Sequence, residues 1–92
     1  MAIGVIWHPP GDQQAYDAVK ERVFRAAQDA GMRFHAAGNS PEGWRIIEVW
    51  DSREGLEGFI DQHLGPAINE LSGGQAPPPE PEVVFDVYYQ MT

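Results

Sequence analysis

The chain has 92 residues, no cysteine, and a formal net charge of −8 from six Lys plus Arg against fourteen Asp plus Glu. The lack of thiols excludes disulfides and thiolate metal sites, and the acidic balance excludes the basic surface that nucleic acids and anionic membranes require. We therefore expect one small domain, residues 1–92, with no nucleic-acid or membrane partner.

Residues 2–8 form a short apolar run that ends at Pro9, which predicts the first strand. The run lacks the basic flank of a signal peptide and the length of a transmembrane helix, so we expect a cytoplasmic protein. Asp12 predicts the N-cap of a helix, and Gly31 predicts its end. Between them an apolar stripe recurs at three- and four-residue steps. The stripe comprises Tyr16, Val19, Val23, Ala26, Ala27 and Ala30.

Residues 32–39 and 44–51 are expected to be two strands joined by the type I turn Ser-Pro-Glu-Gly, and so to form a β-hairpin. Its register has two alternatives. One pairs Ser40 with Trp44 and turns His35 away from Glu48. The other pairs Asn39 with Trp44 and sets His35 opposite Glu48. Turn chemistry favours the first, whereas the pairing of two part-buried polar groups favours the second.

Ser52 predicts the N-cap of a second helix, which Gly65 and Pro66 are expected to break or kink before a short further piece. One face of this helix is apolar. That face carries Leu56, Phe59, Ile60, His63 and Leu64. Four prolines in residues 75–82 predict a stiff, extended connector, and residues 83–89 are expected to form the last strand.

The element order βαββαβ predicts an α+β, ferredoxin-like fold: a four-stranded antiparallel sheet with two helices on one face. The strands are apolar on both faces, however. In the last strand Val83 and Phe85 oppose Val84, and in the third strand Ile46 opposes Ile47. Because two helices cover only one face, the second face is expected to pack against the same face of a second copy. This arrangement is a homodimeric α/β barrel.

Residues 47–54, Ile-Glu-Val-Trp-Asp-Ser-Arg-Glu, run from a strand through Trp50 into a Ser-capped helix. This motif resembles the dimeric α/β-barrel proteins, and within them the antibiotic-biosynthesis-monooxygenase-type domains. The resemblance implies a pocket between the sheet and the helices, lined by Trp50 as in the quinone-forming oxygenase branch. Many members carry a His on the second helix where this chain has Phe59. That position is a Trp in the haem-degrading branch, whose Asn and His also have no match here, so no haem or other cofactor is expected.

Trp44, Glu48 and Trp50 share one face of the third strand by their period-two spacing. Two indoles with a carboxylate between them could hold a flat aromatic substrate while Glu48 takes a proton from it. In the alternative interpretation both Trp residues are core, and Glu48 pairs with Arg33 or Arg45.

His35 is the best single titratable candidate, because His changes charge near physiological pH. Tyr16 on the inner face of the first helix could donate a hydrogen bond into a pocket. Phe59 and His63 on the second helix complete the candidate ligand-binding set. No His pair has the i, i+4 spacing of a helical zinc site, so no metal is expected.

The sequence thus favours a protein that binds a small apolar or aromatic molecule. Our first hypothesis is a cofactor-independent monooxygenase, cyclase or isomerase acting on an aromatic or polyketide-like substrate, with His35 and Glu48 as catalytic residues. The alternative is a non-catalytic ligand-binding or assembly module whose own side chains fill its core. A ligand-sized pocket supports the first, and a solid core supports the second.

Overall fold

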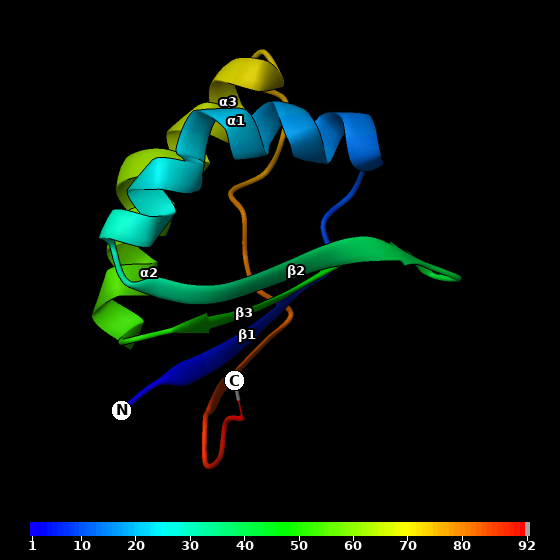
Figure 1. Cartoon of the computed structure of the whole chain (residues 1–92). Helices are drawn as coiled ribbons and strands as arrows, with labels where there is room; N and C mark the ends of the chain where they lie inside the picture. Colours follow the sequence, from blue (N-terminus) through cyan, green and yellow to red (C-terminus); the bar gives the residue numbers. More distant parts are fainter. Residues whose placement is uncertain (92) are drawn as a thin grey trace.

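A computed structural model describes residues 1–91 of the chain, so the last position of the expected domain 1–92 lies outside the described residues. The four strands form one antiparallel sheet in the order β2-β3-β1-β4, as Figure 1 shows. The elements are β1 (Ile3–Trp7), α1 (Gln13–Asp29), β2 (Met32–Ser40), β3 (Gly43–Trp50), α2 (Arg53–Phe59), the π-helical turn η1 (Ile60–Leu64), α3 (Gly65–Leu71) and β4 (Val83–Asp86). The predicted α+β sheet with helices on one face is confirmed.

The helix α1 begins and ends where the sequence indicates. The Asp12 side chain accepts a hydrogen bond from the Ala15 N–H at 3.1 Å, which satisfies one of the free donors of the first turn. Gly31 follows the helix with a φ of 109°, a left-handed conformation that suits glycine. Val23 and Ala27 of the predicted stripe are buried against the sheet.

Of the expected break or kink at Gly65 and Pro66, the break is wrong, because α2, η1 and α3 follow one another without an interruption, and the further helical piece is α3. The Gly65 N–H donates to the Ile60 carbonyl, a hydrogen bond that spans five residues. Proline has no N–H, and its ring crowds the carbonyl four residues earlier in an α-helix. A wider π turn just before Pro66 makes room for that ring. None of the helices in residues 1–91 is both long and apolar enough to cross a membrane.

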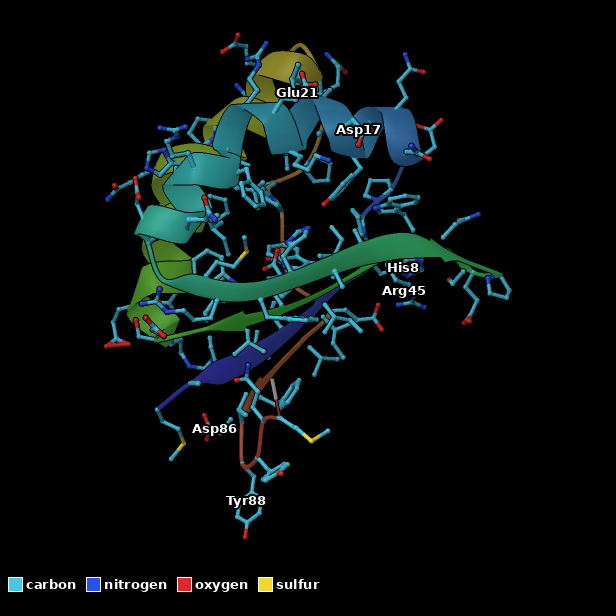
Figure 2. The ribbon with its side chains drawn as sticks, viewed as in Figure 1. His8, Asp17, Glu21, Arg45, Asp86 and Tyr88 are labelled. Carbon is cyan, nitrogen blue, oxygen red and sulfur yellow. The ribbon has the colours of Figure 1, made fainter. Side chains whose placement is uncertain are left out.

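The strand β4 is shorter than the predicted 83–89 and ends at Asp86. Its last pair joins Asp86 to Ile3, where β1 itself begins. Among residues 1–91, one further hydrogen bond, from the Val87 N–H to the Ala2 carbonyl, continues the pairing at this end. β4 thus loses its partner at the start of β1, although the apolar pattern of the sequence continues to Tyr89. Tyr88 extends away from the sheet and is fully exposed (Figure 2).

The helices cover one face of the sheet, and the core lies between (Figure 1). Trp50 and Val5 are fully buried there. The opposite face has no cover within residues 1–91. Its exposed apolar side chains come from three strands: Phe34, Ile47, Val83 and Phe85. We call this set the outer face.

Candidate functional site

The hairpin has the register that sets His35 opposite Glu48, with Asn39 paired to Trp44. Ser40 also pairs with Gly43, and the Ser40 hydroxyl donates to the Gly43 carbonyl at 2.7 Å. Of the two alternatives, the structure therefore has the one that joins the polar side chains. Burying a carboxylate without hydrogen-bond donors costs more than a less favourable turn.

The Glu48 carboxylate is the buried centre of the site, with only 7% of the residue exposed. Its Oε1 atom accepts from two indole N–H groups, Trp7 at 2.9 Å and Trp50 at 2.8 Å. Sequence reasoning missed Trp7 as a member of the site. Trp7 lies on the neighbouring strand β1, diagonal to Glu48 because Val5 is the direct partner of Glu48. The sequence shows that Trp7 shares one face of its strand with Ile3 and Val5. It does not show that β1 pairs with β3, which is what brings Trp7 to Glu48.

The second oxygen of Glu48 holds His35. The His35 Nδ1 atom lies 2.9 Å from Glu48 Oε2, and its Nε2 atom lies 2.5 Å from the Tyr16 hydroxyl oxygen. A carboxylate that accepts two indole N–H groups acts as an acceptor, so Nδ1 carries the proton and donates to it. The Nε2 lone pair then accepts the Tyr16 hydroxyl proton. We call Tyr16, His35 and Glu48, in this order, the relay.

Burial and the negative charge of Glu48 both raise the pKa of Tyr16, and burial has the larger effect. Asp17, the next residue on α1, adds to the same shift. The Tyr16 hydroxyl is therefore protonated throughout the neutral range and is the hydrogen-bond donor to His35.

The alternative in which Glu48 pairs with an arginine is wrong. The Arg33 Nε atom lies 2.9 Å from Asp51, and the Arg45 guanidinium lies 2.7 Å from Glu82. Both arginines lie outside the core that holds Glu48, Arg33 in the exposed part of β2. The buried carboxylate thus obtains its hydrogen bonds from aromatic side chains and one imidazole.

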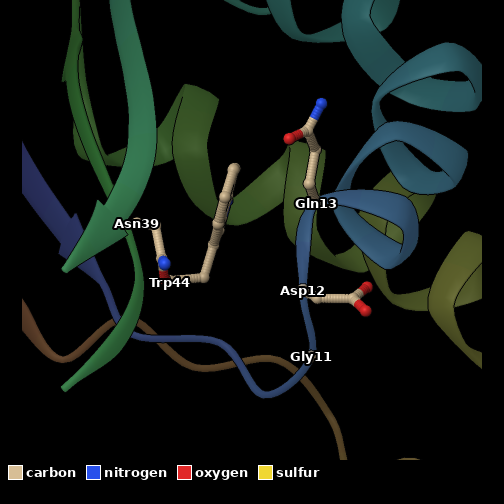
Figure 3. Close-up of a pocket in the computed structure, with 5 residues that line it drawn as sticks. All are labelled: Gly11, Asp12, Gln13, Asn39 and Trp44. Atoms are coloured by element: carbon tan, nitrogen blue, oxygen red, sulfur yellow. The ribbon is translucent and has the colours of Figure 1, made fainter. Parts of the chain in front are cut away.

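A cleft of about 270 Å³ lies between the hairpin and the start of α1 (Figure 3). Trp44 forms one wall, and its ring centroid is 5.4 Å from that of Tyr16. The cleft is therefore one aromatic ring away from the relay. The residues that line it are Gly11, Asp12, Gln13, Asn39 and Trp44.

The other candidate residues lie outside this cleft. Trp50 is fully buried, and its ring packs 5.2 Å from Phe59, which is also core. His63 on η1 is exposed and stacks on Phe59 at 6.2 Å, with no hydrogen bond to the relay. Over residues 1–91 no three His, Asp or Glu side chains are grouped so that they could hold a metal ion. The structure therefore brings together Tyr16, His35, Glu48 and both tryptophans of β3. Phe59 contacts this set only through Trp50, and His63 lies apart from it.

Solved structures give a fold comparison for the whole chain. Rv0793 from Mycobacterium tuberculosis superposes with a TM-score of 0.62 at 17% identity, over 99% of this chain and 97% of that protein. A protein named as a putative antibiotic biosynthesis monooxygenase from Chloroflexus aurantiacus J-10-fl gives a TM-score of 0.57 at 18% identity, over 99% and 98%. The chain shares their fold. This shared fold is the ferredoxin-like α+β fold. No protein-family model and no curated protein matches the sequence.

Proposed function

We propose that this protein is a small-molecule enzyme that transfers protons through the relay. The observation that carries the proposal is the unbroken chain of contacts from Glu48 to His35 at 2.9 Å and from His35 to Tyr16 at 2.5 Å. A hydroxyl, an imidazole and a buried carboxylate in this order are the parts of a general acid–base device, with the carboxylate orienting the imidazole. The fold shared with a monooxygenase-named protein supports the same class.

In the proposed step, a substrate that enters from the cleft past Trp44 gives the proton of an acidic C–H or O–H to the Tyr16 oxygen. The Tyr16 proton moves at the same time to His35 Nε2. The resulting imidazolium is stabilised by the Glu48 carboxylate beside Nδ1, and the substrate is left as the conjugate anion. Reprotonation at another atom gives an isomerase or cyclase outcome. A monooxygenase outcome requires dioxygen as the oxidant of the substrate anion.

The substrate class we propose is a flat aromatic or polyketide-like molecule. Two observations support it: the indole wall that Trp44 gives the cleft, and the Tyr16 ring that packs at a tilt on Trp44 and is itself stacked on His35. Aromatic walls favour planar ligands because stacked rings exclude water from a large area. The proton transfer itself uses only side chains of this chain.

A non-catalytic binding or assembly module is the second candidate, and one observation favours it. Every polar atom of Glu48, His35 and Tyr16 in the relay has a partner within the protein, and Trp50 and Val5 fill the core beneath. The sole role of such a closed network can be to fix the register of the hairpin. The two candidates differ in whether Tyr16 exchanges protons with a bound molecule.

The test is a ligand screen followed by hydrogen exchange. A thermal-shift screen of aromatic polyketide-like and quinol compounds finds binders, because a ligand that binds only the native state raises the melting temperature. We then expect the protein to catalyse deuterium uptake from D2O into a binder with an acidic C–H. Tyr16→Phe is expected to slow this uptake about 100-fold while keeping the ring that packs on Trp44. Tyr89→Phe, at an exposed position, serves as the matched control.

An absence of binders, or equal uptake rates for the Tyr16→Phe variant and the unmodified protein, contradicts proton transfer by the relay. Either result supports the non-catalytic module. A rate that falls in the Tyr16→Phe variant but not in the Tyr89→Phe variant supports the enzyme.

We also propose that the outer face pairs with the outer face of a second copy. Ile47 on β3 is 51% exposed, Phe34 lies on the neighbouring strand β2, and Phe85 lies on β4 beyond β1, all on the same face. Burying each such side chain is worth about 1.5–3 kcal/mol, so a two-fold dimer gains much from covering the patch. In the dimer, the helices would cover one face of each sheet and the partner's sheet would cover the other.

Replacing Ile47 with Glu is expected to convert the dimer to a monomer at low micromolar concentration, because two carboxylates would meet in an apolar interface. Sedimentation velocity measures the change. Phe24→Glu, at an exposed apolar position on α1, is the matched control and should leave the dimer intact. A well-folded single chain in the unmodified protein contradicts the dimer.

A further inference from the structure

The relay places a phenol against a proton acceptor, and this arrangement also favours the loss of an electron. A phenol that loses an electron becomes a strong acid, so its oxidation is easy only where a base takes the proton at the same moment. The Tyr16 hydroxyl oxygen lies 2.5 Å from His35 Nε2, and the centroids of these two stacked rings are 5.9 Å apart. The other two tyrosines of the chain, Tyr88 and Tyr89, are exposed, so solvent must take their proton.

The charges around the relay favour the same loss. When the Tyr16 proton moves to His35, an imidazolium forms 2.9 Å from the Glu48 carboxylate. Because Glu48 is only 7% exposed, the reduced relay holds a buried anion and the oxidised relay holds an ion pair. The Lys20 ammonium, 5.5 Å from the Tyr16 ring centroid, opposes oxidation but is itself paired with Asp17 at 3.6 Å. The net charge of −8 on the whole chain also makes the loss of an electron easier.

Trp44 connects the relay to the cleft. Its indole forms a wall of that cleft (Figure 3), and its ring centroid is 5.4 Å from that of Tyr16. The Trp44 N–H is buried and has no acceptor among residues 1–91. An oxidised indole is stabilised when a base takes its N–H proton. Since Trp44 has no such base, an oxidised Trp44 stays a cation and remains able to take an electron from Tyr16.

We propose that the relay is a one-electron donor, in which Tyr16 reduces an oxidant in the cleft through Trp44 and passes its own proton to His35. The oxidant class is an oxygen-centred organic radical. The radical takes one electron from Trp44 and leaves as its anion, and Tyr16 returns one electron to Trp44. The Tyr16 O–H bond breaks as an N–H bond forms at His35 Nε2. The products are a neutral tyrosyl radical and an imidazolium beside the unchanged Glu48 carboxylate. This activity needs no acidic substrate and goes beyond the proposed proton transfer.

The test generates a one-electron oxidant by a laser flash. Tris(bipyridine)ruthenium(II) is excited in the presence of hexaammineruthenium(III), which leaves the oxidising ruthenium(III) complex of bipyridine. The Tyr88→Phe/Tyr89→Phe protein has Tyr16 as its single tyrosine, and the Tyr16→Phe protein, with exposed tyrosines alone, is the matched comparison. Transient absorbance and EPR distinguish a tyrosyl from an indolyl radical.

We expect the Tyr88→Phe/Tyr89→Phe protein to form a tyrosyl radical at a rate that does not change with phosphate concentration, because His35 takes the proton. In the Tyr16→Phe protein the rate should rise with phosphate, because the buffer must act as the base. In the first background, His35→Ala is expected to slow the formation of the radical about 100-fold, as the loss of a positioned base does. Free imidazole should restore the rate, and Trp44→Phe should slow it without making it depend on phosphate.

Three results overturn the proposal: a radical that stays on an indole, a Tyr16 rate that rises with phosphate, or a His35→Ala rate equal to that of its parent. The first two use substitutions at exposed positions only, so they decide even if the His35→Ala variant folds poorly. An unchanged rate in the Trp44→Phe variant overturns the path through Trp44. The flash experiment needs no substrate. A tyrosyl radical without deuterium uptake therefore supports the electron donor and contradicts the proton-transfer enzyme, and uptake without the radical does the reverse.

Discussion

Replacing Glu48 with Ala is expected to lower the free energy of unfolding by about 3 kcal/mol or more. The substitution removes the acceptor of three donors, the N–H groups of Trp7, Trp50 and His35. Each buried donor left without a partner costs about 1–3 kcal/mol. For a domain of this size the loss corresponds to a fall in melting temperature of about 12 °C or more. Urea denaturation followed by tryptophan fluorescence measures it.

The matched control is Glu21→Ala, an exposed acidic position on α1 (Figure 2), where we expect a change within about 0.5 kcal/mol. A Glu48→Ala variant as stable as the Glu21→Ala variant would mean that the carboxylate does not hold the three donors in solution.

The isosteric variant Glu48→Gln tests the direction of the same hydrogen bonds. Its amide oxygen can still accept the two indole N–H groups, but its NH2 group then faces His35 as a donor. His35 must accept at Nδ1, so its proton moves to Nε2, and Tyr16 becomes the acceptor. The pKa of Tyr16 is expected to fall, because the Glu48 charge is one cause of its rise. The ¹⁵N shifts of the imidazole and a tyrosinate absorbance titration, with Tyr16→Phe as the blank, report the two changes. If the His35 tautomer is unchanged in the Glu48→Gln variant, the proton positions assigned to the relay are contradicted.

Substituting Ala at Gly55 and at Gly58 is expected to change stability in opposite directions, although both residues lie in α2. A Cβ atom on Gly55 would clash with the carbonyl oxygen of Ala30, the C-cap residue of α1. That oxygen belongs to the backbone, so the helices must move apart, at a cost of about 2 kcal/mol. A Cβ atom on Gly58 meets nothing within 4 Å, and the gain in helix propensity is about 1 kcal/mol.

The same denaturation measurement serves both variants, and each is the control of the other. Because the chemical change is identical, the difference between them isolates the close approach of α2 to the end of α1. If both variants gain stability, the two helices are not in contact at Gly55. This contact matters for the site because α2 follows directly after β3, the strand that carries Glu48 and Trp50.

Local signals in the sequence were sufficient to predict the type and order of the helices and strands. Asp12 and Ser52 cap their helices as expected, because a short polar side chain before an apolar stripe satisfies the free N–H groups of the first turn. Strand positions followed from apolar runs and turn residues. The sequence failed at two places. β4 ends early because its distant partner β1 begins at Ile3, and no break occurs at Pro66 because the π turn just before it makes room for the proline ring.

The candidate site was predictable only in part, for the same reason. Period-two spacing placed Glu48 beside Trp50, and amphipathic spacing placed Tyr16 on the inner face of α1. Spacing along the second helix also predicted Phe59 and His63 as ligand-binding residues. That spacing does not say which part of the sheet each residue of the helix lies against. In the structure Phe59 packs on Trp50 in the core and His63 is exposed.

What the sequence determined by itself is the order of the elements, the excess of apolar residues on both sheet faces, and the residue types that could move a proton. The tertiary structure decided which of them meet. Local turn preferences differ by little between the two hairpin registers, whereas a buried carboxylate requires donors. Those donors come from β1, β2 and β3 together, so Trp7, His35 and Trp50 become its partners only once the sheet has formed.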